Sequence, residues 1–96
     1  MIGGETAVTD DGGERLWLVE RTYTDRDLVV LVYATPDGRW RYRRELSPSM
    51  VGRTTVTAAT EVDANDLEAV DDPETRQRYA GEVDRVRGSH DPDESI

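Results

Sequence analysis

The side chains with the clearest chemical potential in this sequence belong to a stretch of arginines interleaved with aromatic residues. The arginines are Arg39, Arg41, Arg43, Arg44 and Arg53. Trp40 and Tyr42 alternate with the first three, and Glu45 is the only acid between positions 39 and 60. Guanidinium groups bind phosphate and aromatic rings stack on unpaired bases, so this composition is typical of a surface for single-stranded nucleic acid. Protein carboxylates are the competing partners, because the guanidinium fork matches a carboxylate in a bidentate pair.

The alternation of side chains along this stretch favours the carboxylate partners. In an extended strand, Arg39, Arg41 and Arg43 point to one face, while Trp40 and Tyr42 point to the other, where we expect the rings to join the core. The counterion release that drives nucleic-acid binding weakens steeply with salt, and the charge elsewhere in the chain repels phosphate. We therefore predict that the arginines pair with neighbouring acids, and we keep nucleic acid as the alternative partner.

Residues suited to catalysis are sparse. The chain has no Cys and no Lys, and His90 is its only histidine. A catalytic triad needs a general base beside its nucleophile, and a phosphate-binding loop needs its Lys, so neither kind of active site is indicated. We expect a protein that is not an enzyme, with no catalytic residue, no cofactor-binding residue and no cofactor.

Two acidic stretches invite comparison with metal sites. His90 lies in an acidic tail, but a flexible tail would lose much conformational entropy on closing around an ion. The acids between positions 63 and 74 miss the calcium-loop pattern, which requires Gly where this chain has Glu68 and an oxygen ligand where it has Leu67. The sequence therefore predicts no metal site, and these acids are expected to cap helices and face solvent.

Composition indicates one small domain adapted to salt. The 96 residues carry 21 acids against 12 bases, a net charge of −9, and every base is Arg. A GC-rich genome would explain the loss of Lys but not the excess of acids. In molar salt the Debye length falls to about 3 Å and clustered carboxylates no longer repel one another. We therefore favour a salt-adapted, soluble domain.

Targeting signals are not evident in the sequence. No apolar run approaches the roughly 18 residues of a membrane span, and the first residues lack the basic and apolar regions of a secretory signal. We expect a cytoplasmic protein.

Three strands are predicted in the first half of the chain. Residues 16–24 alternate with β-branched and aromatic content, residues 28–34 form a continuous apolar run, and residues 39–46 alternate strictly. Between the last two lies Thr35-Pro36-Asp37-Gly38, a turn in which Pro fixes φ and Gly accepts a positive φ. The pattern predicts an antiparallel meander with residues 28–34 as the central strand.

The second half adds helix to this meander. The Thr-rich residues 53–60 favour a fourth strand, and residues 65–70 favour a short helical turn with Asn65 as its N-cap. A longer helix follows, with Asp72 as N-cap and Gly88 as its left-handed C-cap. We predict an α+β fold: a three- to four-stranded antiparallel β-meander followed by one or two helices packed on one face.

The expected domain organisation has three parts. Residues 1–14 are rich in Gly, Asp and Thr without periodicity and predict a mobile N-terminal arm. Residues 15–87 form the single α+β domain. Residues 88–96 predict an acidic, disordered tail.

Self-association is the function class that this architecture favours. A small meander has two sheet edges to protect and a sparse core to enlarge, and a second copy can meet both needs. Because one helix covers one face only, we predict a homodimer that involves Leu28, Val30 and Val32; alternatively, residues 54–70 close the second face. We expect a non-enzymatic interaction module with a second copy or another protein as its partner. Nucleic acid at the arginines is the alternative, and no membrane association is expected.

Overall fold

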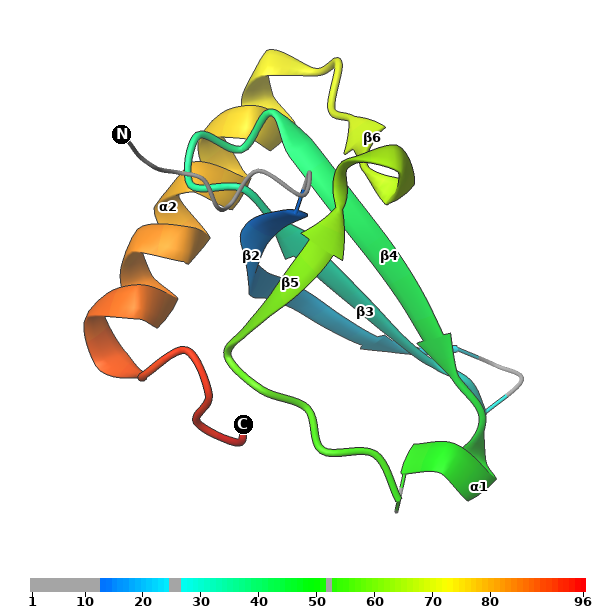
Figure 1. The fold of residues 1–96 in the computed structure, drawn as a ribbon. Coiled ribbons are helices and arrows are strands. Elements are labelled where there is room, and N and C mark those ends of the chain that lie inside the picture. The colour runs from blue at the N-terminus through cyan, green and yellow to red at the C-terminus, as the bar shows by residue number, and fades with distance from the viewer. Residues whose placement is uncertain (1–12, 25–26, 52) are drawn as a thin grey trace.

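The computed structural model describes residues 13–24, 27–51 and 53–96 (Figure 1). The strands are β2 (Gly13–Tyr23), β3 (Val29–Ala34), β4 (Trp40–Leu46), β5 (Ala59–Asp63) and β6 (Glu68–Ala69). The helical segments are α1 (Pro48–Val51), the 3-10 turn η2 (Ala64–Asp66) and α2 (Pro73–Ser89). The strands form one antiparallel sheet in the order β5-β2-β3-β4-β6. The α+β class is therefore confirmed, with five strands instead of three to four.

Strand β3 occupies the centre of the sheet because its residues are apolar on both sides. All six of its residues are buried, and it pairs with β2 on one side and β4 on the other. Val30 and Val32 belong to the core beneath α2, whereas Val29 and Leu31 belong to a second core on the opposite face. The predicted central strand is confirmed.

The turn between β3 and β4 has the predicted chemistry. Gly38 adopts φ 73° and donates its N–H to the Thr35 carbonyl at 2.8 Å. The Asp37 carboxylate accepts the Thr35 hydroxyl at 2.7 Å and the Arg39 N–H at 2.9 Å. These bonds, the Thr35 hydroxyl first, hold the pKa of Asp37 below its ordinary value. The turn thereby fixes the register of β4 against β3.

A β-bulge changes the face to which the second half of β2 points. Leu18 lies opposite Tyr33 and Glu20 lies opposite Val32, so Val19 is the extra residue. An inserted residue reverses the alternation that follows it, and Glu20 consequently shares the face of α2 with Val32. Simple alternation along residues 16–24 does not reveal this change.

Helix α2 covers one face of the sheet (Figure 1). Asp72 caps it as predicted, because its side chain accepts the Thr75 N–H at 2.9 Å. The buried side of the helix consists of Tyr79, Val83 and Val86. The core that they complete also contains Trp17, Val30, Val32, Ala34, Ala58, Ala59 and Val70. The helical spacing of the apolar residues therefore identified the packing face of this helix correctly.

The opposite face of the sheet is covered by irregular segments. Its core contains Leu16, Leu18, Val29, Leu31, Tyr33, Leu46 and Val62. The partly buried side chains that pack against it are Tyr42, Val56, Leu67 and Ile96. Residues from the 54–70 region thus help to close the second face, which is the alternative that the sequence left open.

The sheet is curled, as the connection between its two edge strands requires. β5 and β6 lie at opposite edges of the sheet but are separated only by η2 and Leu67. This connection reaches about 13 Å, given a rise of ~2 Å per residue in a 3-10 turn and ~3.3 Å when extended. The edges of a flat five-stranded sheet would lie about 19 Å apart at the usual strand spacing. The sheet therefore curls so that its two edge strands approach each other.

Three local predictions in the second half need correction. The fourth strand is displaced from residues 53–60 to β5. The N-cap of η2 is Asp63, whose carboxylate accepts the Asn65 N–H at 2.9 Å, so the predicted cap at Asn65 is wrong. The predicted cap at Gly88 is also wrong, because α2 continues through it and His90 is the C-cap.

Residues 88–96, which we expected to form a disordered tail, comprise the last residues of α2 and a segment that is hydrogen-bonded to the rest of the domain. After α2 ends, the Ala58 N–H donates to the Glu94 carbonyl and the Ile96 N–H donates to the Val56 carbonyl, both at 2.9 Å. The segment is held by backbone pairing with residues far away in sequence, which its acidic composition does not reveal. Of the expected mobile arm, Gly13–Glu14 belong to β2, and the rest lies outside the described residues.

Candidate interaction surface

Strand β4 carries three of the arginines that the sequence singles out, and it divides them between two faces. Arg41 lies opposite Ala34, and Arg43 lies opposite Val32. Both therefore share the face on which α2 packs. Arg44 follows in the strand and points to the other face, so the predicted separation of Arg41 and Arg43 from the rings is observed.

Arg41 and Arg43 each have a carboxylate partner. Arg41 Nε lies 3.4 Å from Glu68 Oε1, an ion pair without hydrogen-bond geometry. Arg43 Nη2 lies 3.6 Å from Glu45 Oε2, with side chains 58% and 53% exposed. A hydrogen bond to Tyr79, with further help from Glu68, raises the pKa of Arg41 above its ordinary value. The Arg43–Glu45 pair is exposed on both sides and contributes at most about 1 kcal/mol, so these two side chains are available for exchange with a partner.

The aromatic residues of β4 differ in their burial. Tyr42 packs against the second core, and its ring centroid lies 6.3 Å from that of Tyr33. Burial raises the pKa of Tyr33, and the charge of Arg44 on the same face acts in the opposite direction. Trp40 is 43% exposed, so the expectation that both rings join the core is wrong for Trp40.

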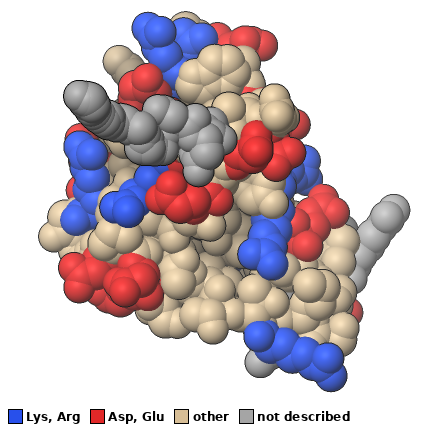
Figure 2. All heavy atoms as spheres, in the orientation of Figure 1, with Lys and Arg blue, Asp and Glu red and all other residues tan. Residues whose placement is uncertain are grey.

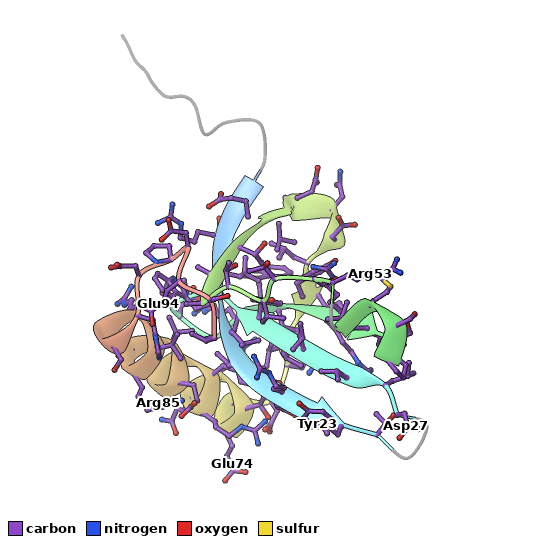
Figure 3. All side chains as sticks on the ribbon, turned by 90° about the horizontal axis from the view of Figure 1, so that it is seen from below. Tyr23, Asp27, Arg53, Glu74, Arg85 and Glu94 are labelled. Carbon is purple, nitrogen blue, oxygen red and sulfur yellow. The ribbon has the colours of Figure 1, made fainter. Side chains whose placement is uncertain are left out.

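The remaining predicted arginines lie elsewhere on the surface. Arg39 is exposed in the turn before β4, and Arg53 is exposed on the side of the sheet opposite α2 (Figure 3). On the face shown in Figure 2, basic and acidic groups are interspersed and form no continuous basic field. Among the five arginines, the structure brings together only Arg41 and Arg43.

A shallow groove of about 280 Å³ lies beside α2 on the same face. Its walls are Glu20, Thr22, Thr24, Val30, Val32, Arg41, Arg43 and Tyr79. Arg78 contacts two of these wall residues, with Nη2 3.7 Å from Glu20 Oε1 and its guanidinium 5.3 Å from the Tyr79 ring centroid. Val30 and Val32, which we expected at a self-association surface, form the floor and are only 7% exposed each. Leu28, the third such residue, is half-buried just before β3.

The backbone groups of β4 point alternately toward β3 and away from it. The Thr35 N–H donates to the Trp40 carbonyl at 3.0 Å, so even-numbered residues of β4 direct their backbone groups toward β3. The Val70 N–H donates to the Arg39 carbonyl at 2.8 Å. Odd-numbered residues therefore direct their N–H and C=O groups outward.

The outer edge of β4 is unpaired over its second half. β6 pairs only with Trp40 and Arg41, and no strand in the described ranges lies beside Arg43 and Glu45. We call the outward N–H and C=O groups of these two residues the open edge. Sequence reasoning missed it, since alternation shows which face a side chain takes but not which side of a strand lacks a neighbour.

The comparisons with known proteins relate nearly the whole chain to one family. A family model described as "Family of unknown function (DUF7967)" matches residues 9–96. The chain belongs to the DUF7967 family. No curated protein and no solved structure matches it. The residues matched by the DUF7967 model include those of β4, the groove and the segment after α2.

Metal ions and membranes call for other kinds of site in the described part of this DUF7967 domain. No group of three or more His, Asp or Glu side chains there is placed to hold a metal ion. No helix of the described residues is long and apolar enough to cross a membrane. His90 Nδ1 lies 2.5 Å from Glu94 Oε2, a contact that positions the final segment of the chain. The open edge and the adjacent groove bring outward backbone groups and two partly exposed arginines together at β4.

Proposed function

We propose that this DUF7967 domain is a non-enzymatic interaction module that associates with a second copy of itself. The observation that carries the proposal is the open edge of β4. Unpaired strand edges recruit further strands unless they are blocked by proline, a bulge, a covering element or unmatched charges. Beside Arg43 and Glu45, β4 contains no proline and no bulge, and the two charges at its edge are of opposite sign.

The placement of hydrophobic residues supports association at this edge. Leu46 is buried at the end of β4, and Tyr42 is half-buried on the same face. A strand added beside β4 would cover the remaining exposed part of Tyr42 and extend the second core. Strand addition derives its affinity from main-chain hydrogen bonds and its specificity from alternate side chains.

The solvent in which this module works is part of the proposal. The excess of acids, which gives a net charge of −9, supports a cytoplasm of high salt. There the repulsion between two acidic copies is screened within about 3 Å. Association is therefore expected to be strongest in molar KCl.

The experiment that tests the proposal is light scattering coupled to size exclusion in about 2 M KCl, a salt concentration that screens net charge. We expect twice the chain mass for the wild type and the monomer mass for Glu45→Pro. Proline at position 45 removes an outward N–H but no bond to β3, so the circular dichroism spectrum is expected to be retained. A monomeric wild type across the accessible concentrations would refute the proposal.

A second candidate function is binding of single-stranded nucleic acid. The observation that favours it is the placement of Arg41 and Arg43 side by side along the groove. Electrophoretic binding of a labelled oligonucleotide in molar KCl, with wild type and Arg41→Glu/Arg43→Glu compared, separates the two candidates. Binding that the double variant abolishes would support the nucleic-acid function, and no shift of the wild type would exclude it.

A further inference from the structure

We infer that the second copy adds to β4 in an antiparallel register centred on Arg44, so that each Arg43 faces Glu45 of the other copy. This inference rests on the proposed self-association and specifies its contact. It would join the two sheets into one continuous sheet across a two-fold axis. The partner is a second copy of this chain because the open edge is complementary to itself.

The direction of the backbone groups restricts the register. Two identical strands that pair antiparallel in one sheet are related by an axis perpendicular to the sheet, and residues that face each other share a face. Only Arg43 and Glu45 offer outward groups in the unpaired part of β4. The axis can therefore pass through Arg43, Arg44 or Glu45.

The three possible positions of the two-fold axis differ in the residues that they place opposite each other. A centre on Arg43 places two Arg43 side chains opposite each other and requires Arg41, which β6 already occupies. A centre on Glu45 places two Glu45 carboxylates opposite each other and extends the pairing beyond Leu46, where β4 ends. Each of the three centres, Arg44 included, places one pair of like charges opposite each other on the axis, so the availability of edge groups decides, and neither of these two centres can be formed from the open edge alone.

A two-fold axis through Arg44 pairs all the outward N–H and C=O groups of the open edge. Arg43 of each copy then faces Glu45 of the other, and a hydrogen-bonded antiparallel pair exchanges both N–H···O bonds. The symmetry produces this pair twice. The side chains of Arg43 and Glu45 already lie 3.6 Å apart within one chain and are more than half exposed, so they can exchange partners without leaving the surface.

On the opposite face, the same register pairs apolar residues. Tyr42 of each copy faces Leu46 of the other, next to the second core to which both contribute. The two Arg44 side chains meet at the axis, and this is the one unfavourable contact. Their repulsion is reduced by salt, which is consistent with a module that associates in a high-salt cytoplasm.

Charge reversal tests this register directly, and it is performed at the lowest KCl concentration at which the wild type is dimeric. Arg43→Glu places two acids opposite each other, and Glu45→Arg places two bases opposite each other. We expect each variant alone to dimerise at least tenfold more weakly than the wild type. An equimolar mixture of the two restores both cross-strand pairs, so we expect a heterodimer of wild-type affinity.

The mixture separates a contact between copies from a role within one chain. An Arg43–Glu45 pair that acts only within its own chain is broken in both variants and is not restored by mixing them. Single variants that dimerise normally, or a mixture that stays monomeric, would overturn the Arg44-centred register. A monomeric wild type would refute the proposed function itself, so the two failures are distinguishable.

A cross-link at the axis gives an independent readout. The chain has no Cys, so Arg44→Cys introduces a single thiol. Residues that face each other in a non-hydrogen-bonded pair have Cα atoms about 4.5 Å apart, within the range of a disulfide. We expect rapid oxidation to a covalent dimer for Arg44→Cys, and none for the control Glu74→Cys on the exposed start of α2 (Figure 3). Equal rates for the two variants would overturn the register.

Discussion

Gly38 packs directly against the backbone carbonyl of Arg76. A Cβ built on Gly38 would overlap that carbonyl and lie 3.1 Å from the Ala80 nitrogen. The same glycine holds the positive φ of the β3–β4 turn. One residue thus connects the meander to α2 and fixes how closely the helix approaches the sheet.

Replacement of Gly38 by Ala is expected to destabilise the fold by about 2–3 kcal/mol, because a non-glycine residue at positive φ is strained and the methyl group has no space beside Arg76. The free energy of unfolding from urea titration, measured by circular dichroism, checks this value. A loss below about 0.5 kcal/mol, the level typical of surface substitutions, would contradict the proposed contact.

The matched control is Gly81→Ala in the exposed part of α2. A Cβ at this position meets no atom within 4 Å, and Ala is a better helix former than Gly. We expect a gain of roughly 0.5–1 kcal/mol in the free energy of unfolding. Opposite signs for the two Gly→Ala variants would show that the positive φ and the close packing of Gly38, and not loss of glycine as such, determine the effect.

The final segment of the chain is expected to depend on pH through Glu94. Its carboxylate accepts a bond from the His90 ring at 2.5 Å and the Asp91 N–H at 3.1 Å, and these bonds lower the pKa of Glu94. A lowered folded-state pKa contributes stability above the ordinary glutamate pKa, and that contribution is lost as the pH falls through the folded-state value.

The wild type is therefore expected to be more stable than Glu94→Gln near neutral pH, and the difference is expected to vanish in acid. Urea titrations of both proteins at several pH values between neutral and acidic measure the difference. Glu74→Gln serves as the control, because Glu74 is exposed on α2 and has no carboxylate contact of this kind. A constant difference between wild type and Glu94→Gln at all pH values would contradict this role of the carboxylate.

Salt is expected to raise the melting temperature. A net charge of −9 on a domain of this size destabilises the compact state by self-repulsion, and KCl screens that repulsion. Calorimetry from dilute buffer to about 2 M KCl is expected to show a continuous rise. The rise is expected to be smaller for Asp71→Asn/Glu74→Gln, which removes two exposed acids. A flat response would remove the case for salt adaptation.

The structure also predicts an effect at the contact between Arg21 and the end of the described chain. Arg21 Nη2 donates to the Ile96 carbonyl at 2.6 Å. In Arg21→Gln, hydrogen exchange at the amides of Ala58 and Ile96 is expected to accelerate several-fold. Both amides form hydrogen bonds that join the final segment to residues 56–58. Exchange in the core of β3 is expected to stay unchanged, and faster exchange there would indicate global destabilisation instead.

Local chemistry explains which parts of this fold the sequence predicts. The apolar run of β3, the Pro-Asp-Gly turn and the Asp72 cap each depend on neighbouring residues, and each is found as expected. The pairing of β5 with β2 joins Arg15 and Glu61 across 46 positions, and no local pattern encodes it. The same limit applies to residues 88–96, whose order depends on contacts with residues 56–59.

The candidate surface shows the same division. Strict alternation along β4 predicts the faces of Arg41 and Arg43, but it does not identify their carboxylate partners, which are Glu68 on β6 and Glu45 on β4 itself. The open edge depends on how far β6 extends along β4, which is settled by η2 and the curl of the sheet. Tertiary geometry, and not composition, therefore creates the surface that we propose for association.

The large separation in sequence between β2 and β5, which pair at one edge of the sheet, has a consequence for the order of folding. The meander of β2, β3 and β4 is built from contacts between neighbours in sequence, whereas β5 must close a long loop to reach β2. Loop closure slows the formation of contacts of high sequence separation. We therefore expect the meander to act as the folding nucleus, with β5 and β6 joining in the last kinetic step. The edge of β4 would then be available before the chain is fully folded, and association during synthesis would compete with closure of the sheet.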